Sequence, residues 1–463
     1  MDPTLSLAVA AGKMTAATIR RLGRGGGTTL PGRVSSTIDG RALQKLSAGL
    51  SRGAILVAGT NGKTTTSTLL RTVLETAGIR VVANRAGSNL VGGLTSAVVQ
   101  DSGLRGGARA EAGVFEVDEA SLPAAVEAIA PRVVIVTNLF RYQLDRYGEL
   151  ESSSAAISSA LAALPAASVA LLCADDPRVA AMGRGLRARA VYYGLDDDQA
   201  GQAEVPHAAD ARFCPFCGHS FDFKRVYAGH LGHYRCPTGD FERPAPDIAA
   251  RSITFQHLDA QAMTVAGLGF DGTVLDVPLS GVYNSYNILA AAGAAALFGI
   301  SPERIAPALA SFRPAFGRLE QVEVEGRKVH LMLAKNPAGF NEVLRASSTL
   351  GGGTHYVVAL NDRIADGRDV SWIWDVDFEL LDGATSIVVA GDRGLDMRVR
   401  LKYAGIDPQR IAVAEAPGDA ISAMLAGTSP GDDVFVLPTY TAMLDLRAEM
   451  AARGYLKQFW EES

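Results

Sequence analysis

Residues 59–66 read Gly-Thr-Asn-Gly-Lys-Thr-Thr-Thr, and this stretch decides the fold. It follows the apolar run 54–58, which has the length of a buried strand, and it precedes a segment of helical composition. The glycines let the backbone curl so that successive N–H groups face a phosphate at the helix N-terminus. Lys63 supplies a positive charge there, and the Thr64 hydroxyl can ligate Mg²⁺. General P-loop spacing would place a glycine at position 57, where this chain has Val57, so the loop is a shortened variant.

Short β-branched runs alternate with helical segments on both sides of this loop. Near-continuous apolar runs are typical of strands buried on both faces, so the pattern predicts an α/β fold with a parallel, doubly wound sheet. A second, smaller α/β unit is predicted after residue 313, because the alternation repeats there. The predicted strands are 54–58, 114–117, 133–137, 169–173, 356–360, 386–390, 411–414 and 434–437; the predicted helices include 64–77, 155–164 and 287–298.

Length and charge set the outer limits of function. The chain has 463 residues, enough for about three domains. We predict a basic N-terminal segment (1–50), a nucleotide-binding domain (51–312) with an inserted module (205–250), and a C-terminal α/β domain (313–463). The 44 Lys and Arg against 49 Asp and Glu give a net charge of −5, which argues against nucleic acid as a partner. No run of 18 apolar residues exists, so no transmembrane helix is predicted.

The first 52 residues have the opposite charge from the rest. Eight Lys and Arg against two Asp give a local charge of +6. Residues 5–22 are predicted to form an amphipathic helix, and they resemble a signal peptide poorly because the charges follow the apolar stretch. The expected role is packing on the next domain in a cytoplasmic protein. Peripheral contact with an anionic membrane at its inner face is the alternative.

The four cysteines are unevenly placed. Cys214, Cys217 and Cys236 fall within 23 positions, and Cys173 stands apart. In a reducing compartment such a cluster indicates a metal first and a disulfide second. Cys-Pro-Phe-Cys-Gly-His at 214–219 is typical of half a zinc ribbon, and repeating its spacing puts the fourth ligand on Gly239, which has no side chain. The candidate substitutes are His219, His230, His233 and Asp240; a metal-free relic is the alternative.

The shortened loop resembles that of the Mur ligase family, the ATP-dependent peptide-bond formers of peptidoglycan synthesis. Further stretches resemble the family in order: 114–119, 137–145, 174–177, 284–287 and Phe-Gly-Arg-Leu-Glu at 316–320. The resemblance implies that Glu116 and Thr64 hold Mg²⁺, that Asn284 contacts adenine, and that Arg318 reaches the nucleotide from the hinge. It implies that ATP is bound by the loop residues Gly59, Thr60, Asn61, Gly62, Lys63, Thr64 and Thr65.

Departures from ordinary Mur ligases narrow the resemblance. This chain has Tyr-Gln-Leu-Asp at 142–145 and Leu-Ala-Lys-Asn-Pro at 333–337, and the segments 334–339 and 361–375 resemble the MurT family instead. MurT proteins are the synthetase subunits of lipid II isoglutaminyl synthase. The resemblance implies that Asp369 completes a catalytic triad in trans by orienting a histidine of a glutaminase partner, with Asp366 as the close alternative. From the residues alone, either carboxylate could merely cap a helix.

A glutaminase needs a reactive thiolate beside a base, and this chain offers no good candidate. Cys173 ends an apolar strand run, and the other three thiols have metal-like spacing. The resemblance therefore implies a separate GatD-like glutaminase subunit. It also implies the reaction, ATP-dependent amidation of the D-glutamate α-carboxyl in lipid II through an acyl phosphate. Two alternatives remain open, an autonomous Mur-type ligase that adds an amino acid and a non-catalytic ATP-binding scaffold.

Overall fold

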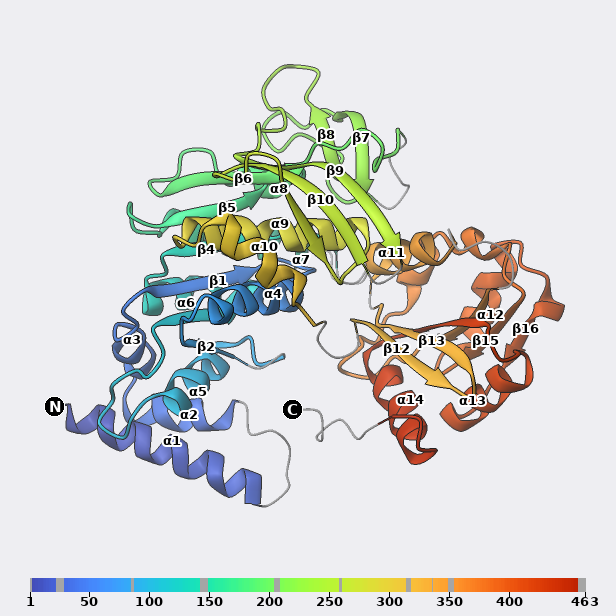
Figure 1. Cartoon of the computed structure of the whole chain (residues 1–463), viewed down its shortest axis with the longest axis horizontal. Coiled ribbons are helices and arrows are strands. Elements are labelled where there is room, and N and C mark those ends of the chain that lie inside the picture. Colours follow the sequence, from blue (N-terminus) through green and yellow to red (C-terminus); the bar gives the residue numbers. More distant parts are fainter. Residues whose placement is uncertain are drawn as a thin grey trace.

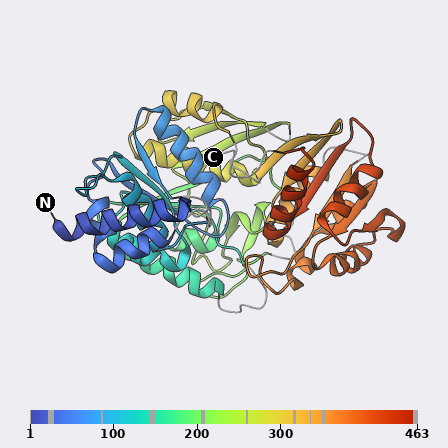
Figure 2. The ribbon, with the colours of Figure 1, turned by 90° about the horizontal axis from the view of Figure 1, so that it is seen from below.

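The computed structural model describes residues 2–21, 29–84, 87–141, 149–203, 209–257, 260–313, 318–334, 336–348 and 354–456. Two sheets with helices on their faces form two lobes that lie side by side (Figure 1). The N-terminal helices lie at the end of the first lobe away from the second (Figure 2). The predicted boundary at 313 falls between the last helix of the first lobe and the first strand of the second, and it stays a prediction.

The first lobe contains a nine-stranded sheet in the order β11-β10-β9-β6-β5-β4-β1-β3-β2. Its central strands are parallel, and every side chain of β3 and β4 is buried, which explains their continuous apolar runs. At one edge of the sheet, β9, β10 and β11 pair with one another in antiparallel fashion. The strands are β1 (Gly53–Ala58), β2 (Val81–Ala83), β3 (Ala112–Glu116), β4 (Val133–Val136), β5 (Val169–Cys173), β6 (Arg189–Leu195), β9 (Ile248–His257), β10 (Ala260–Gly267) and β11 (Thr273–Val277).

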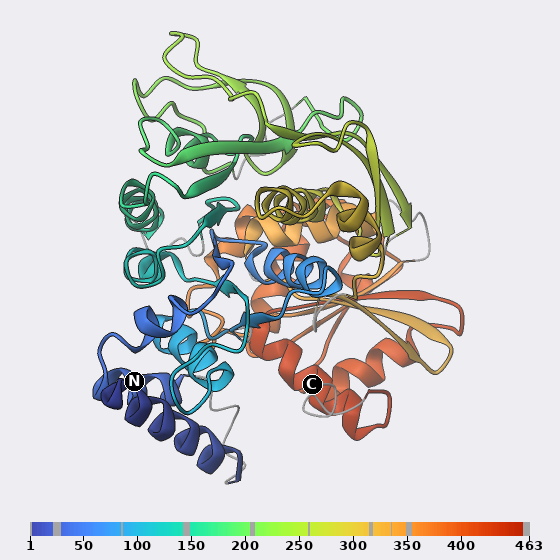
Figure 3. The same ribbon diagram turned by 60° about the vertical axis from the view of Figure 1, so that its left-hand side comes forward.

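Helices cover this sheet and fix the loop that follows β1. The alanine-rich helix α9 (Val282–Leu297) packs beside α4 (Lys63–Thr76), as Figure 3 shows. Small side chains let the two helices approach closely. The remaining helices of the lobe are α5 (Val91–Asp101), α6 (Leu122–Ile129), α7 (Glu149–Ala162), α8 (Pro177–Ala181), α10 (Pro302–Ala310) and the 3₁₀ turn η1 (Glu119–Ser121).

The N-terminal segment folds onto this lobe. It forms α1 (Pro3–Arg21), α2 (Leu30–Ile38) and α3 (Ala42–Ser47), and α1 packs against α2 and α5. The helix predicted over 5–22 is therefore present, and its apolar face, with Leu5 and Val9 buried, is used for packing. Within the described residues, no helix is long and apolar enough to cross a membrane.

The second lobe contains a six-stranded sheet in the order β12-β13-β17-β14-β15-β16. Only the β12–β13 pair is antiparallel, and separate apolar clusters cover the two faces. The strands are β12 (Arg318–Val324), β13 (Arg327–Met332), β14 (His355–Ala359), β15 (Ser386–Ala390), β16 (Ile411–Val413) and β17 (Asp433–Pro438). The helices are α11 (Pro337–Ser348), α12 (Gly394–Tyr403), α13 (Pro417–Ala426) and α14 (Tyr440–Ala452), with 3₁₀ turns η2 (Ser371–Asp375), η3 (Phe378–Leu381) and η4 (Pro408–Arg410).

The cysteine module lies between β6 and β9, which are neighbours in the large sheet. Its hairpin consists of β7 (Asp222–Ala228) and β8 (Leu231–Arg235). Two buried carboxylates after β5 anchor it: Asp175 accepts from Arg243 Nε at 2.5 Å, and Asp176 lies 3.2 Å from His230 Nε2. The module is thus fastened to the sheet by groups that are themselves desolvated and paired.

Candidate functional site: a nucleotide loop, an aspartate loop and a thiol cluster

The loop between β1 and α4 requires glycine at two positions. Gly59 has φ +119°, and a Cβ there would lie 2.3 Å from Thr137 Oγ1. Gly62 has φ +85°, and a Cβ there would lie 2.0 Å from Asn287 Oδ1. Left-handed backbone and close approach each exclude a side chain. The turn that presents backbone N–H groups at the start of α4 therefore depends on both residues.

Charged and hydroxyl groups gather around this turn. Lys63 Nζ lies back over the loop, donating to the carbonyls of Gly59 at 2.5 Å and Thr60 at 3.3 Å, and it pairs with Glu119 Oε1 at 2.9 Å. Thr64 Oγ1 donates to Glu116 Oε2 at 2.8 Å. Thr64 lies in the first turn of α4 and Glu116 ends β3, so the two oxygens meet at the carboxyl edge of the sheet. Hard oxygen ligands of this kind suit Mg²⁺.

Asparagine and threonine side chains hold the loop from two sides. After β4, Thr137 Oγ1 and Asn138 Nδ2 donate to the Asn61 carbonyl at 2.7 and 3.1 Å, and Asn138 Oδ1 accepts from the Asn61 N–H at 3.0 Å. From the second lobe, Asn336 Nδ2 donates to Asn61 Oδ1 at 2.9 Å. The two lobes thus touch at the loop between β1 and α4.

The other predicted nucleotide contacts lie around the same edge. Asn284, in the first turn of α9, donates to Ser280 O at 2.7 Å and accepts from Asn287 Nδ2 at 3.1 Å. Thr65 is buried beneath the loop. Arg318 begins β12, but its side chain lies outside the described residues, as do residues 142–148 and 316–317. The role of each in binding ATP stays a prediction.

Two side chains at this edge make contacts that the sequence did not predict. Glu119 pairs with Lys63 across 56 positions, and Asn287 fills the space that Gly62 leaves empty. The available signal was weak: both lie inside stretches that resemble the Mur ligases, but pairing across such separations follows from the fold and not from spacing.

The aspartate-rich loop leaves β14 at the carboxyl edge of the second sheet. Asp366 is bound inward: its Oδ1 accepts from Thr441 N at 2.8 Å and its Oδ2 from the Thr441 hydroxyl, in the first turn of α14. Asp369 is half-exposed, and within the part of the chain that the structure describes it accepts only from Ser371, two residues on, from N and Oγ at 2.8 Å each. Asp366 therefore resembles a helix cap, whereas Asp369 lies at the surface.

Exposed apolar residues lie beside this loop. On α12, Leu395, Val399 and Tyr403 recur every four residues and are 66%, 49% and 73% exposed. The ring of Trp374, which is 51% exposed, lies 5.6 Å from that of Tyr403. Residues four apart share one face of a helix, so these four side chains form one patch, called here the α12 patch.

Cys173 is fully buried at the end of β5. Burial, with the negative charges of Asp175 and Asp176, raises the pKa of its thiol well above the ordinary value. A protonated, buried thiol is a poor nucleophile. This agrees with the expectation that Cys173 is inert.

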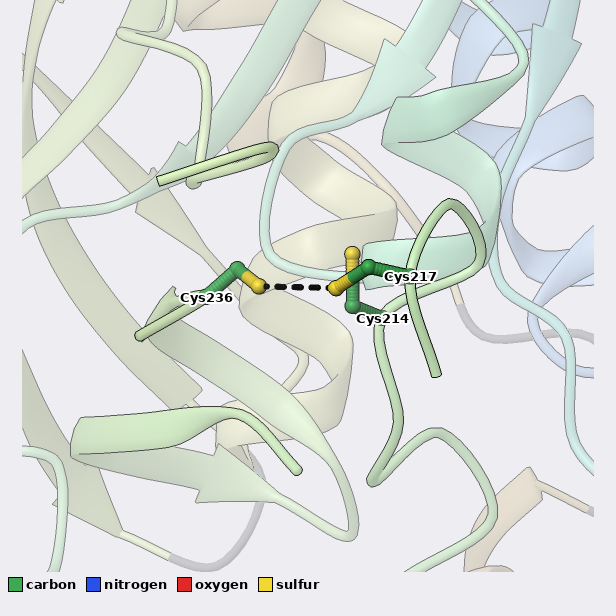
Figure 4. A group of neighbouring side chains, drawn as sticks. All are labelled: Cys214, Cys217 and Cys236. Atoms are coloured by element: carbon green, nitrogen blue, oxygen red, sulfur yellow. Dashed lines mark hydrogen bonds between the residues drawn. The ribbon is translucent and has the colours of Figure 1, made fainter. Parts of the chain in front are cut away.

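The other three thiols converge, as Figure 4 shows. The Sγ atoms of Cys214, Cys217 and Cys236 all lie within 4.8 Å of one another, and those of Cys217 and Cys236 are 3.3 Å apart. Burial raises the pKa of the Cys214 thiol. All four cysteines are free thiols. Three converging sulfurs from two turns are a donor set that fits Zn²⁺.

Two of the four substitutes proposed for the missing ligand are wrong. His230 is buried against Asp176, and His233 Nε2 lies 2.8 Å from Leu195 O. Both imidazoles therefore face the large sheet instead of the thiols. Asp240 lies near the cluster, because its Oδ2 accepts from Thr238 Oγ1 at 2.8 Å, and that hydroxyl is 3.2 Å from Cys217 Sγ.

The chain has a P-loop-like turn at the edge of a parallel sheet, and a second α/β lobe contacts this turn. This arrangement is that of a Mur ligase-like protein. Solved structures agree: a pseudomurein peptide ligase type C from Methanothermus fervidus superposes with a TM-score of 0.67 at 20% identity, covering 87% of this chain and 79% of that one. MurF ligase from Thermotoga maritima in complex with ADP gives 0.63 at 15% identity, covering 90% and 85%. These likenesses concern the fold.

Sequence comparisons name the family. Residues 57–234 match the Mur ligase middle domain, and residues 333–443 match the MurT ligase C-terminal family. The chain is 32% identical to the lipid II isoglutaminyl synthase (glutamine-hydrolyzing) subunit MurT of Staphylococcus aureus N315, over 82% of this chain and 84% of that relative. It is 29% identical to the Streptococcus pneumoniae R6 subunit of the same name, over 99% of each. The chain belongs to the MurT family.

Proposed function

We propose that this chain is the synthetase subunit of a lipid II isoglutaminyl synthase. It would convert the α-carboxyl of D-glutamate in the lipid II stem peptide to the primary amide of D-isoglutamine, using ATP. The observation that carries the proposal is the pairing of Thr64 with Glu116 beside Lys63 and the glycine turn, in a chain of the MurT family.

The chemistry has two steps that balance. An oxygen of the substrate carboxylate attacks the γ-phosphorus of ATP, the bond from that phosphorus to the bridging oxygen breaks, and ADP leaves with an acyl phosphate formed. Ammonia then attacks the acyl carbon, phosphate departs, and a proton is lost to leave the amide. Phosphoryl transfer of this kind depends mainly on positioning and on stabilising charge.

The loop residues have the properties for the first step. The N–H groups at the start of α4 would bind phosphate oxygens, and Lys63 would exchange its contacts with the Gly59 and Thr60 carbonyls for the phosphates. Thr64 and Glu116 would hold Mg²⁺, which screens the phosphate charge when bound. Asn284 would contact adenine and Arg318 the nucleotide at the hinge. Because Asn336 reaches Asn61 from the second lobe, activity would be sensitive to closure of the lobes.

Ammonia would come from a GatD-like glutaminase bound to the second lobe. Cys173 is buried, so the partner must supply the nucleophilic cysteine. Asp369 would orient the partner's histidine, since it is half-exposed and bonded only locally, whereas Asp366 is committed to α14. The α12 patch, beside this loop, would form part of the docking surface, because aromatic and aliphatic side chains dominate the centres of stable interfaces.

Zinc and location complete the proposal. Cys214, Cys217 and Cys236 would hold a structural Zn²⁺ that joins the two turns of the module. The protein would act in the cytoplasm at the inner face of the membrane, where the headgroup and stem peptide of lipid II are accessible. Binding to lipid II and the basic residues of the N-terminal segment would provide peripheral contact with the membrane.

The test is reconstitution with defined substrates. Purified chain, a glutaminase partner, Mg²⁺, ATP and lipid II are incubated with glutamine or with ammonium chloride, and the stem peptide is analysed by mass spectrometry. Formation of the amide with either nitrogen source supports the proposal. ATP turnover driven by an amino acid, with a peptide bond formed and no response to ammonia, would support an autonomous ligase instead. If no acceptor supports ATP turnover, the remaining hypothesis is a non-catalytic ATP-binding scaffold.

A further inference from the structure

The two turns that carry the thiols differ in length. In the first turn, Gly218 has φ +77° and its N–H donates to Cys214 O at 2.9 Å, four residues back. In the second, Gly239 has φ +81° and its N–H donates to Cys236 O at 3.0 Å, three residues back. The left-handed glycine therefore comes one residue earlier in the second turn. The residue that precedes it is Cys217 in the first turn and Thr238 in the second.

Thr238 accordingly occupies the place of the missing cysteine. Its Oγ1 lies 2.9 Å from Cys236 Sγ and 3.2 Å from Cys217 Sγ. Gly239, the position that the spacing predicted, does not occupy that place, because a Cβ built on Gly239 meets nothing within 4 Å. Ligands 2.0 to 2.3 Å from a tetrahedral zinc stand about 3.5 Å apart. The separations among Cys217, Cys236 and Thr238, at 2.9 to 3.3 Å, are within about half an ångström of that spacing, and Cys214 Sγ lies within 4.8 Å of the other two sulfurs.

Asp240 holds the hydroxyl in this position. Thr238 Oγ1 donates its hydrogen to Asp240 Oδ2 at 2.8 Å, which leaves the oxygen lone pairs on the side of the thiols. A carboxylate behind a metal ligand orients it and raises its basicity. Asp240 would thus orient the Thr238 oxygen in the same way that such carboxylates orient ligating histidines.

We propose that Zn²⁺ in this module has three sulfur ligands and one oxygen ligand, the hydroxyl of Thr238, oriented by Asp240. The inference rests on the proposed zinc site and names its fourth ligand. A neutral hydroxyl attracts the ion less strongly than a thiolate. The site therefore holds zinc less tightly than a four-cysteine ribbon would.

Cobalt substitution in the full chain tests this. Metal is removed, Co²⁺ is titrated in, and the sulfur-to-cobalt absorption is recorded for the wild type, Thr238→Cys and Gly239→Cys. We expect Thr238→Cys to add a fourth sulfur, with stronger absorption per cobalt and zinc release to a chelator slowed about tenfold or more. Gly239→Cys is the matched control and keeps the wild-type spectrum.

A second variant guards against misfolding. Asp240→Asn keeps the side-chain size but removes the carboxylate charge, and loss of such an outer partner lowers metal affinity about 10- to 100-fold. Wild-type protein that binds no cobalt overturns the zinc site and this inference together. Wild-type protein that binds cobalt, with an unchanged spectrum in Thr238→Cys or a fourth sulfur in Gly239→Cys, overturns only the inference.

Discussion

The loops after β1 and β14 both leave the carboxyl edge of a parallel strand, yet they are built in opposite ways. The first is largely buried and held by contacts within the chain: Lys63 is paired with Glu119, and Asn61 is bonded by three other side chains. The second has a half-exposed carboxylate and a neighbouring apolar patch that is open to solvent. Under the proposed function, the first loop would carry chemistry within this chain, and the second would receive a partner subunit.

Removing the Lys63 ammonium should have the largest effect. In Lys63→Ala, amidation with glutamine and with ammonia should both fall by about 10⁴-fold, because charge on the transferring phosphoryl group loses a fixed cation. Steady-state rates with each nitrogen source measure this. Lys45→Ala is the control, since that ammonium pairs with Asp2 and Asp39 at the N-terminus. Glutamine-driven activity in Lys63→Ala close to wild type would favour the scaffold alternative.

Asp369→Asn should separate the two nitrogen sources. Glutamine-driven amidation should fall about 10³-fold, because the partner's histidine loses the carboxylate that orients it, while ammonia-driven amidation stays near wild type. Glutamate release by the assembled complex is the direct measurement.

Asp366→Asn provides the contrast on the same loop. It replaces one of the two carboxylate oxygens that accept from Thr441 with an amide nitrogen, so the free energy of unfolding should fall by about 1 kcal/mol, and activity should show no preference between nitrogen sources. If Asp366→Asn alone abolished glutamine hydrolysis, the triad role would belong to Asp366.

A charge within the α12 patch should weaken the complex without touching the first loop. Val399→Glu should lower the affinity for the glutaminase about 10- to 100-fold, since a carboxylate would be buried without a partner in the interface. Binding is measured by calorimetry, and ammonia-driven amidation should be unchanged. Val274→Glu on β11 is equally exposed and serves as control. Equal affinity in both variants would place the interface elsewhere.

The sequence predicts some of these regions better than others, and the reasons are physical. The β1 loop is a local motif, so its strand, turn and helix could be predicted, and the Mur ligase fold is confirmed. The contacts of Glu119 and Asn287 could not be predicted, because they cross 56 and 225 positions. The antiparallel strands β9 to β11 were also missed, since their alternating burial lacks the continuous apolar runs of the central strands.

The thiol cluster shows a different limit. Spacing identified the three cysteines but placed the fourth corner at Gly239, because counting residues assumes two turns of equal length. Only the backbone shows that the second turn is one residue shorter and that Thr238 faces the sulfurs. Likewise, the resemblance preferred Asp369 to Asp366, but only the structure shows that Asp366 accepts from the first turn of α14, 75 positions later.

The smallest expected effect lies where the two lobes meet. Asn336 bonds Asn61 with its amide and the Gly339 N–H with its oxygen, so Asn336→Ser keeps a capping oxygen for α11 but cannot reach the loop. Loss of one hydrogen bond of about 1 kcal/mol should lower kcat/KM for ATP roughly fivefold for both nitrogen sources. Asn341→Ala is the control, because its oxygen accepts from Asp377 within the second lobe and its loss should reduce stability alone. A wild-type kcat/KM in Asn336→Ser would mean that the β1 loop binds ATP independently of its contact with the second lobe.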